Sequence, residues 1–306
     1  MTHFSQKRRK ELTFVLLMIA IPLIQFIIFW GYVNLDSILM GFKNMNGAWS
    51  LANFDRFWNE VKKGLIQSSI ANSLINLAVA EFITLPLVMV FSYLLYKKCY
   101  GSSLFRVLFY LPSLISAVVM SNLFSALVTP FGSNSGPYIM IMQKLGLNVS
   151  KDVLKYGLLG MPRTAFATIM VYCLWTGVGM NLVLLSGALA RAPQDLFDAG
   201  KVDGCGMGRE FINIVVPLIW PTITTLFIFN LAGCFTMYMP IMLLTNGEYD
   251  TMTIGYYIVK HTINSNGDLS TLGYPAAVGL IFTAISMPII LFVKWLFNKI
   301  SEAVEY

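Results

Sequence analysis

Charged residues are scarce in this chain of 306 residues: Asp, Glu, Lys and Arg together make up 12% of it, whereas apolar residues make up 57%. A soluble domain carries about 25% charged residues, which cover its surface. So low a charged content excludes an ordinary water-soluble fold and indicates a chain surrounded by lipid. The formal net charge of +6 does not indicate nucleic-acid binding, because the Lys and Arg residues stand between apolar runs and do not gather on one polar face.

Histidine and cysteine are also rare. The two histidines are His3, near the N-terminus, and His261, between two apolar runs. The cysteines form no close pair with the spacing of a metal site. They are Cys99, Cys173, Cys205 and Cys234. We therefore expect no metal ion and no catalytic centre in this chain.

The phosphate-binding pattern GxxxxGK[ST] of ATP hydrolases is missing as well. Gly200 and Lys201 match the end of that pattern, but Asp195 stands at the first glycine position and Val202 follows the lysine. The glycines at 204, 206 and 208 follow no predicted strand, so they do not indicate a dinucleotide site. The chain is predicted to hydrolyse no ATP itself and to hold no cofactor.

Long apolar runs are what the sequence has in abundance. A hydrocarbon layer about 30 Å thick is crossed by roughly 20 helical residues. The runs that reach this length are Leu12 to Val33, Ile66 to Tyr96, Leu104 to Val128, Ala165 to Leu189, Pro217 to Leu244, and Ala276 to Phe297. They predict an all-α, polytopic membrane bundle of about six helices, with a membrane domain at 12–299 between tails at 1–11 and 300–306. Prolines 86, 112, 221, 240 and 288 are expected to bend or break these helices.

The basic tetrad at residues 7–10 gives the expected orientation. The run after it is longer than the roughly 7 to 15 apolar residues of a signal peptide, and it continues to Trp30 and Tyr32, which suit the far interface. It is therefore predicted to be a retained anchor. The positive-inside rule places the tetrad in the cytoplasm, and six crossings return Lys294 and Lys299 to the same side. We expect both ends of this plasma-membrane protein to be cytoplasmic.

The segment between the fourth and fifth runs, residues 191–217, combines polar residues with helical spacing. It reads RAPQDLFDAGKVDGCGMGREFINIVVP. Pro193 suits the first turn of a helix, and Asp203 with Gly204 supplies the residues of a sharp turn. The pattern predicts two short helices, the second ended at the membrane by Pro217.

Each of these two helices has an apolar face. The residues of these faces are Leu196, Phe197 and Gly200 in the first helix and Met207, Phe211, Ile214 and Val215 in the second. With its apolar sides turned outward, such a helix pair fits a groove on a soluble partner. The alternative is a loop that packs on its own bundle, and the spacing alone leaves both open.

This segment resembles the glutamate-alanine-alanine motif of binding-protein-dependent importer permeases. That pattern runs EAA, two residues, DGA, five residues, F, two residues, I, one residue and LP. The matching positions are Asp198, Ala199 and Gly200, then Asp203, Gly204 and Cys205, then Phe211, Ile214, Val216 and Pro217. The spacing agrees throughout, and the substitutions are conservative; Gly200 in place of Ala costs the first helix about 1 kcal/mol.

The resemblance covers most of the chain and is strongest to the first permease subunit of the maltose-type carbohydrate importers, with their type I fold. It implies a second homologous permease, two copies of a cytoplasmic ATP-binding-cassette ATPase that bind ATP and Mg, an external solute-binding lipoprotein and a sugar as cargo. Residues 191–217 would then be the loop that couples to the ATPase. The implied coupling residues are Leu196, Phe197, Asp198, Ala199, Gly200, Asp203, Gly204, Met207, Phe211 and Pro217.

Two stretches at membrane depth offer sugars both aromatic faces and amide or hydroxyl groups. They are Trp175, Thr176, Gly177 and Asn181 in the fourth run, and Asn230, Thr236 and Tyr238 in the fifth. We predict a substrate path there, since the same parts of the helices line the sugar site in the maltose-type family. The alternative is that Trp and Tyr sit at the interfaces and that Asn and Thr bond between helices. A maltose-like site is not expected, because the family's binding residues are not matched one by one.

Glu81 is the one acid inside an apolar run, and a carboxyl group within the membrane suggests function. It could act as the relay of a proton-coupled secondary transporter or channel, which is the alternative function. It could instead be a neutral, hydrogen-bonded structural residue. A membrane enzyme such as a glycosyltransferase is a third reading, but the clustered acids or histidines that its chemistry needs are missing.

Overall fold

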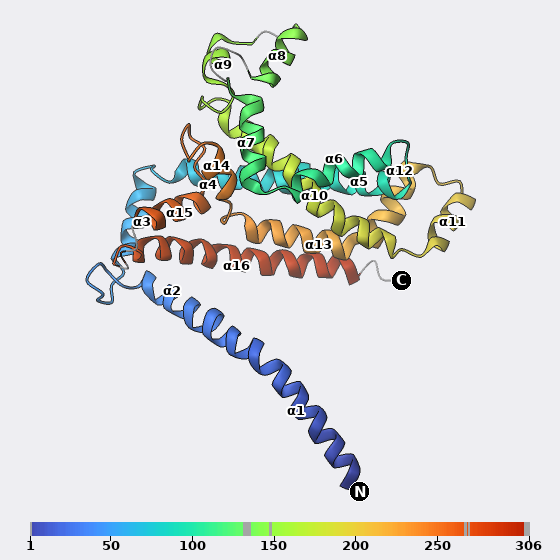
Figure 1. Ribbon diagram of the computed structural model, residues 1–306, viewed down its shortest axis with the longest axis horizontal. Coiled ribbons are helices and arrows are strands. Elements are labelled where there is room, and N and C mark those ends of the chain that lie inside the picture. The colour runs from blue at the N-terminus through green and yellow to red at the C-terminus, as the bar shows by residue number, and fades with distance from the viewer. Residues whose placement is uncertain (1, 131–135, 147–148, 266–267, 269, 303–306) are drawn as a thin grey trace. The chain divides into compact units, whose positions relative to one another are not determined.

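The computed structural model describes residues 2–130, 136–146, 149–265, 268 and 270–302. Regular structure throughout this part of the chain is helical (Figure 1), and its one β-type pairing is an isolated bridge between Lys43 and Trp49. The predicted all-α class is confirmed. The helices fall into two compact units, which are taken one at a time below.

The first unit comprises the residues up to Glu60 together with Lys260–Ile281. Its N-terminal helix runs on through three segments. They are α1 (Thr2–Gln25), the π-helical η1 (Phe26–Tyr32) and α2 (Val33–Gly41). Apolar side chains point outward on all sides of it, and Leu17, Ile21 and Phe29 are each more than 60% exposed. A helix that is apolar all round suits a lipid environment.

Helix α3 (Ala52–Lys62) is held in the same unit by contacts with the start of α16 (Gly273–Glu302). The hydroxyl group of Tyr274 donates a hydrogen bond to Glu60 at 2.6 Å. The guanidinium group of Arg56 lies 4.0 Å from the centre of the Tyr274 ring and 3.1 Å from Glu60. Cation–π and charged contacts thus fix this short helix.

The second unit comprises Val61–Val259 and the chain from Phe282 onward. Helices α15 (Ile254–Asn264) and α16 each contribute residues to both units. The other elements of the second unit are α4 (Gln67–Val79), η2 (Ala80–Thr84), α5 (Leu85–Tyr96), α6 (Ser102–Leu114), α7 (Ala117–Val128), α8 (Pro137–Lys144), α9 (Lys151–Tyr156), α10 (Ala165–Ala190), α11 (Gln194–Val202), α12 (Met207–Glu210), η3 (Phe211–Val215), α13 (Val216–Gly233) and α14 (Met239–Leu244).

Helix α10 lies at the centre of the second unit, where it packs on α5, α6 and α13. Leu182, Leu185 and Leu189 of α10 are fully buried. They share one apolar core with Val88 of α5 and Ile219 of α13. This core ends where the chain leaves α10 for residues 191–217, so it supports that segment directly.

The predicted number of about six membrane helices is confirmed. Within the described residues, four helices are long and apolar enough to cross a membrane. They are Lys10–Gly41, Gln67–Tyr96, Ala165–Ala190 and Gly273–Ile300. Two bent pairs complete the six if each is one span. These are Ser102–Leu114 with Ala117–Val128, bent by 112°, and Met207–Leu218 with Trp220–Gly233, bent by 71°.

The later helices differ in detail from the apolar runs. The fifth apolar run, Pro217 to Leu244, is not one helix, because α13 ends at Gly233 and α14 begins at Met239. Pro240 lies in the first turn of α14, where the missing N–H of proline costs no hydrogen bond. Pro288 lies inside α16, yet that helix continues unbroken to its end.

Candidate coupling site and substrate path

Residues 191–217 form the two predicted helices, α11 and α12, joined by a tight turn. The amide of Gly204 donates to the carbonyl of Lys201 at 3.1 Å, and the amide of Cys205 donates to that of Gly200 at 2.9 Å. This pair of bonds is the helix-ending arrangement known as a Schellman motif. Gly204 has a φ of +70°, a left-handed conformation that favours glycine.

Pro217 does not end the second helix, so this expectation is wrong. The chain passes from α12 through η3 into α13 without interruption, and the 71° bend follows between Leu218 and Trp220. The wide π-helical turn before Pro217 has room for a ring that would clash with the carbonyl of a tighter α-helix. The helix α12 is therefore continuous with the start of the fifth span up to that bend.

The apolar faces of the loop divide between inside and outside. Phe197 is only 1% exposed, and its ring lies 5.1 Å from that of Tyr96. Val215 is also fully buried, whereas Met207 is 56% exposed. Phe197 therefore does not point outward as expected, because helical spacing defines a face but not the neighbour that covers it.

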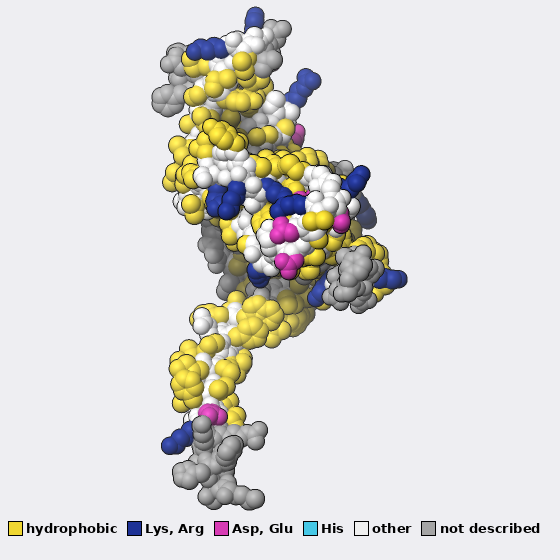
Figure 2. Space-filling view, turned by 90° about the vertical axis from the view of Figure 1, so that its right-hand side faces the viewer, with side chains coloured by type: hydrophobic (Ala, Val, Ile, Leu, Met, Phe, Trp, Pro, Cys, Tyr) yellow, Lys and Arg dark blue, Asp and Glu magenta, His cyan; other side chains and the backbone are white. Residues whose placement is uncertain are grey.

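An apolar surface nevertheless remains outside. Its residues are Leu196, Val202, Met207 and Ile212, and these four are called the outer face below. Figure 2 views the end of the molecule that carries α11 and α12, and it shows apolar side chains there among Lys, Arg, Asp and Glu. One side of the loop thus packs on the bundle, and the outer face is free in this chain; its docking on a partner stays a prediction.

Gly200, which stands in place of alanine in the motif, lies where the two helices meet. A Cβ atom added to Gly200 would lie 2.8 Å from the Cδ1 atom of Ile214. The glycine thus lets α11 approach the segment after α12 closely, which offsets its cost to helix stability. Ala199 and Asp203 are exposed, and Phe211 is half-buried.

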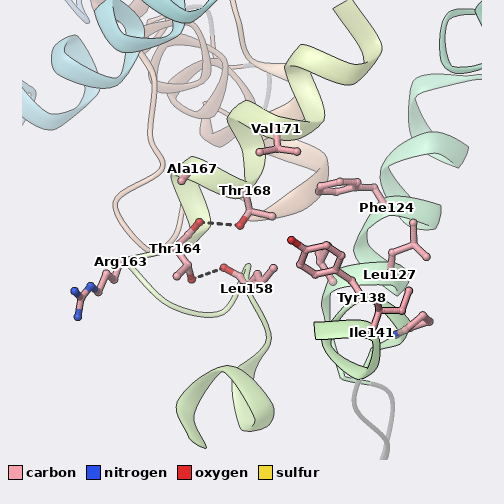
Figure 3. A pocket seen from close by; sticks show the side chains of 12 residues that line it. Phe124, Leu127, Tyr138, Ile141, Leu158, Arg163, Thr164, Ala167, Thr168 and Val171 are labelled. Atoms are coloured by element: carbon pink, nitrogen blue, oxygen red, sulfur yellow. Dashed lines mark hydrogen bonds between the residues drawn. The ribbon is translucent and has the colours of Figure 1, made fainter. Parts of the chain in front are cut away.

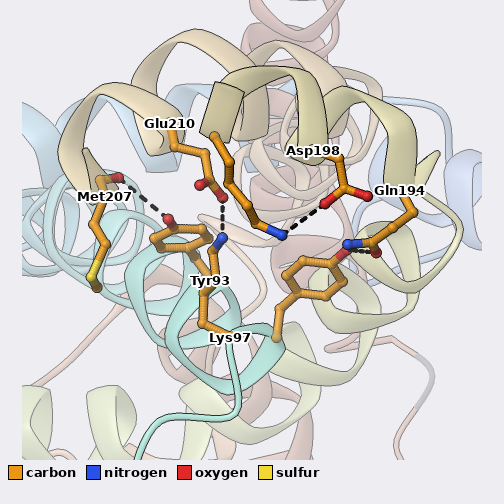
Figure 4. Close-up of polar contacts among 8 residues, drawn as sticks. Tyr93, Lys97, Gln194, Asp198, Met207 and Glu210 are labelled. Carbon is orange, nitrogen blue, oxygen red and sulfur yellow. Dashed lines mark hydrogen bonds and ion pairs between the residues drawn. The ribbon is translucent and has the colours of Figure 1, made fainter. Parts of the chain in front are cut away.

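The end of α5 holds both halves of the loop (Figure 4). The Lys97 ammonium nitrogen lies 2.5 Å from a carboxylate oxygen of Glu210, whose side chain is only 4% exposed. The hydroxyl group of Tyr93 donates to the carbonyl of Met207 at 3.4 Å. The Lys97 nitrogen also lies 5.6 Å from the centre of the Phe197 ring. One helix end therefore contacts α11 through an aromatic ring and α12 through a buried ion pair.

Sequence reasoning missed this contact. Lys97 reads as one of several basic residues after an apolar run, and Glu210 reads as a polar residue of the loop. Nothing in their spacing indicates that they meet. The apolar run that ends at Tyr96 was the one available signal, since it places Lys97 at the membrane surface on the side of the loop.

Asp198 makes a second ion pair in the motif, but on the surface. The Lys201 nitrogen donates to its carboxylate at 2.7 Å, and both side chains are more than half exposed. This hydrogen bond lowers the pKa of Asp198 and raises the pKa of Lys201. Solvent screens such a pair, so it stabilises the loop only weakly.

The predicted substrate-path residues lie on two helices and the turn after them. Trp175, Thr176, Gly177 and Asn181 belong to α10, Asn230 belongs to α13, and Thr236 and Tyr238 precede α14. Five of them are half-buried, and Thr236 and Tyr238 are exposed. A pocket of about 260 Å³ has Thr176 in its wall, together with Ser121, Tyr172 and Pro240, but none of the other six.

Glu81 links the two predicted stretches. It is buried in the π-helical segment η2 and interacts with the side chain of Asn230. Thr84 of the same segment faces Gly177. A Cβ atom added to Gly177 would lie 3.9 Å from the methyl carbon of Thr84. Neither carboxyl oxygen of Glu81 has a hydrogen bond of normal geometry within the described residues. The structural acid and the proton relay both stay predictions for Glu81.

The fold and this loop define a class of protein: a helical membrane subunit in which an exposed apolar loop is fastened to a membrane helix. Residues 95–305 match the model of the binding-protein-dependent transport system inner membrane components, and the chain belongs to this family. The resemblance found in residues 191–217 is confirmed. The chain is a multi-pass inner-membrane permease subunit of an ABC importer.

Curated relatives carry names from sugar uptake. The diacetylchitobiose uptake system permease protein NgcF of Streptomyces coelicolor is 23% identical over 92% of this chain and 82% of its own length. The multiple sugar-binding transport system permease protein MsmF of Streptococcus mutans is 24% identical over 87% of this chain and 89% of its own. The maltose/maltodextrin permease MalF of Salmonella typhimurium is 29% identical over 60% of this chain, but only 36% of its own length is covered.

Solved structures share the fold. A chain of a bacterial ABC transporter involved in the import of the acidic polysaccharide alginate has a TM-score of 0.79 and 20% identity, with 97% of this chain and 98% of that chain covered. A second structure is that of a bacterial alginate ABC transporter in complex with an alginate pentasaccharide-bound periplasmic protein. It has the same TM-score and identity, with 98% of this chain and 99% of that chain covered.

Proposed function

We propose that this permease subunit takes up a sugar or oligosaccharide that an external solute-binding protein delivers. The relatives named for diacetylchitobiose, multiple sugars and maltodextrin support a carbohydrate as cargo. The related transporter bound to a periplasmic protein supports delivery from outside. We further propose that a second homologous permease pairs with this chain, that two ATPase subunits bind ATP and Mg in the cytoplasm, and that this chain performs no hydrolysis itself.

The observation that carries the proposal is that the loop at 191–217 has one exposed apolar side and one side packed on the bundle. Its outer face offers apolar side chains to a partner, while Phe197 and Glu210 fasten the same loop to the end of α5. A groove on the ATPase that receives the outer face would move α11 and α12 together when the ATPase closes. The contacts at Lys97 would pass that movement to α5, and the continuous helix would pass it to α13.

The proposed orientation follows from the basic tetrad at residues 7–10. Placing the tetrad in the cytoplasm puts the C-terminus and residues 191–217 on the same side, where the ATPase is found. In this orientation the outer face of the loop can contact a cytoplasmic ATPase. The substrate path would run between α10 and α13, past Asn181, Asn230 and Glu81.

Family membership favours ATP-driven import over the proton-coupled alternative for which Glu81 was considered. The two mechanisms are separable by experiment. The chain would be purified with its second permease and ATPase, reconstituted in liposomes, and assayed for uptake of labelled diacetylchitobiose, maltodextrins and other oligosaccharides. We expect uptake that requires both internal ATP and the loaded binding protein. Uptake driven by a proton gradient in the absence of ATP would contradict the proposal.

A further inference from the structure

An apolar pocket of about 520 Å³ lies at the end of α10 that is farthest from the coupling loop (Figure 3). Its wall is built from four parts of the second unit. These are Phe124, Leu127 and Val128 of α7, Pro137, Tyr138 and Ile141 of α8, Leu158, Arg163 and Thr164 of the connection before α10, and Ala167, Thr168 and Val171 of α10. Ligand pockets typically have volumes of about 300 to 1,000 Å³, so this one is large enough for a small molecule.

Close backbone packing holds the wall in place. The amide of Leu158 donates to the carbonyl of Val128 at 3.1 Å, which ties the connection before α10 to the end of α7. Gly157 has a φ of +73°, and a Cβ atom there would lie 2.9 Å from the Cα atom of Thr129. Only glycine allows this approach without strain. The connection before α10 and the end of α7 are thus held close together on one side of the pocket.

The two threonine hydroxyl groups of the wall already donate hydrogen bonds. The hydroxyl group of Thr164 donates to the carbonyl of Leu158 at 2.7 Å, and that of Thr168 donates to the carbonyl of Thr164 at 2.8 Å, as the dashed lines of Figure 3 show. These bonds leave the remaining surface of both threonines apolar. A sugar needs many donors and acceptors, and Tyr138 supplies the one further uncharged polar side chain of this wall, so the wall suits a sugar poorly. It suits a hydrocarbon chain.

The charge at the pocket is positive. Arg163 is the single charged residue of the wall, and Figure 3 shows its guanidinium group directed away from the apolar side chains. The two short helices of this region, α8 and α9, carry Lys144, Lys151 and Lys155 against one acid, Asp152. An apolar hollow next to a cation matches a molecule with a hydrocarbon tail and an anionic head.

The surroundings supply such molecules. Helices α7 and α10 are both parts of candidate membrane spans, and Arg163 lies two residues before α10 begins. Basic residues at the end of a span lie at the level of the lipid phosphates. By this rule the pocket would open where acyl chains and headgroups meet.

We propose that this pocket binds an acyl chain of an anionic phospholipid, with Arg163 paired to the lipid phosphate. The site is separate from the coupling loop and from the predicted substrate path, and the proposal does not depend on the identity of the transported sugar. The bound lipid would fill the space between α7 and α10 and hold the bent third span against the central helix.

The test uses the purified transporter in nanodiscs that contain phosphatidylglycerol or phosphatidylcholine with a photoactivatable group in the acyl chain. Labelled peptides are mapped by mass spectrometry. We expect phosphatidylglycerol to label α8 and the first half of α10 more strongly than phosphatidylcholine. Arg163→Ala should reduce labelling by phosphatidylglycerol to the level of phosphatidylcholine, and Ala167→Trp, which fills the pocket, should remove labelling by both.

Matched variants separate the pocket from general effects. Lys144→Ala removes a nearby charge outside the wall, and Leu184→Trp adds a ring to the exposed side of α10; both should label as the unchanged protein does. Ala167→Leu replaces the tryptophan variant if that one does not fold. Equal labelling by the two lipids, or labelling that survives both filling variants, would overturn the proposal. Cross-links from this wall to another protein subunit would show that a protein, not a lipid, occupies it.

Discussion

The ammonium group of Lys97 and the carboxylate of Glu210 are 2.5 Å apart and join the end of α5 to the end of α12. The Glu210 side chain is almost fully buried, so its charge is balanced by Lys97 and not by water. The same lysine lies over the rings of Tyr93 and Phe197. This contact connects the coupling loop to α5, which continues directly from the segment η2 that holds Glu81.

Removing one member of this pair should uncouple transport. Lys97→Met leaves a buried carboxylate without a partner, which costs about 3 to 5 kcal/mol. We expect sugar uptake by the reconstituted transporter to fall at least tenfold. A free-energy change of about 1.4 kcal/mol already changes an equilibrium constant by a factor of ten. ATP hydrolysis should fall less, so uptake per ATP measures the loss of coupling.

Two further variants show whether the burial of the pair matters. The double variant Lys97→Met/Glu210→Leu removes both charges and should recover much of the thermal stability that the single variant loses. Lys201→Met breaks the exposed pair with Asp198 and should change stability and uptake little. A Lys201→Met variant as impaired as Lys97→Met would contradict the special role of Lys97.

The turn between the coupling helices should not tolerate a side chain. Gly204 has a φ of +70°, so Gly204→Val introduces strain of about 1 to 3 kcal/mol. We expect this variant to insert into the membrane but to lose uptake. Gly206→Ala is the matched control, because Gly206 has a φ of −70° and open space around it. Transport by Gly204→Val at the normal rate would remove the turn from the mechanism.

The outer face of the loop should contact the ATPase. Single cysteines at Leu196, Val202 and Met207 should form cross-links to that subunit, because these side chains are exposed. A cysteine at Phe197 should not, since this position is buried beside Tyr96. Efficient cross-linking from Phe197 with none from the outer face would contradict this assignment. It would mean that the buried and exposed sides of the loop are exchanged in the assembled transporter.

The substrate path is tested by removing one polar or aromatic group at a time. Trp175→Ala, Asn181→Ala and Tyr238→Ala should each weaken uptake, by up to about tenfold for one lost hydrogen bond or aromatic contact. ATPase activity stimulated by the loaded binding protein separates a lost sugar contact from a lost coupling step. Unchanged uptake of every transported sugar in all three variants would exclude this path.

Much of the fold follows from the sequence because lipid imposes strict conditions. An apolar run of sufficient length must form a helix in the membrane, where no water can satisfy an open backbone. Six such runs therefore predicted the class and the approximate number of spans. The positions of the helix breaks were less predictable. Pro288 lies inside a continuous helix, whereas the break that begins after Gly233 and ends at Met239 contains no proline.

The coupling loop was also largely predictable, since its information is local. Proline, aspartate and glycine at fixed positions define two helices and a turn, and Gly204 adopts the left-handed conformation that such a turn requires. The sequence by itself thus determined the helical membrane class, the family motif and the local shape of residues 191–217. Only the tertiary structure decided that Phe197 faces inward, that Lys97 meets Glu210, and that Glu81 lies beside Asn230. The physical reason is that helical periodicity fixes which residues share a face, whereas the packing of distant helices determines what that face touches.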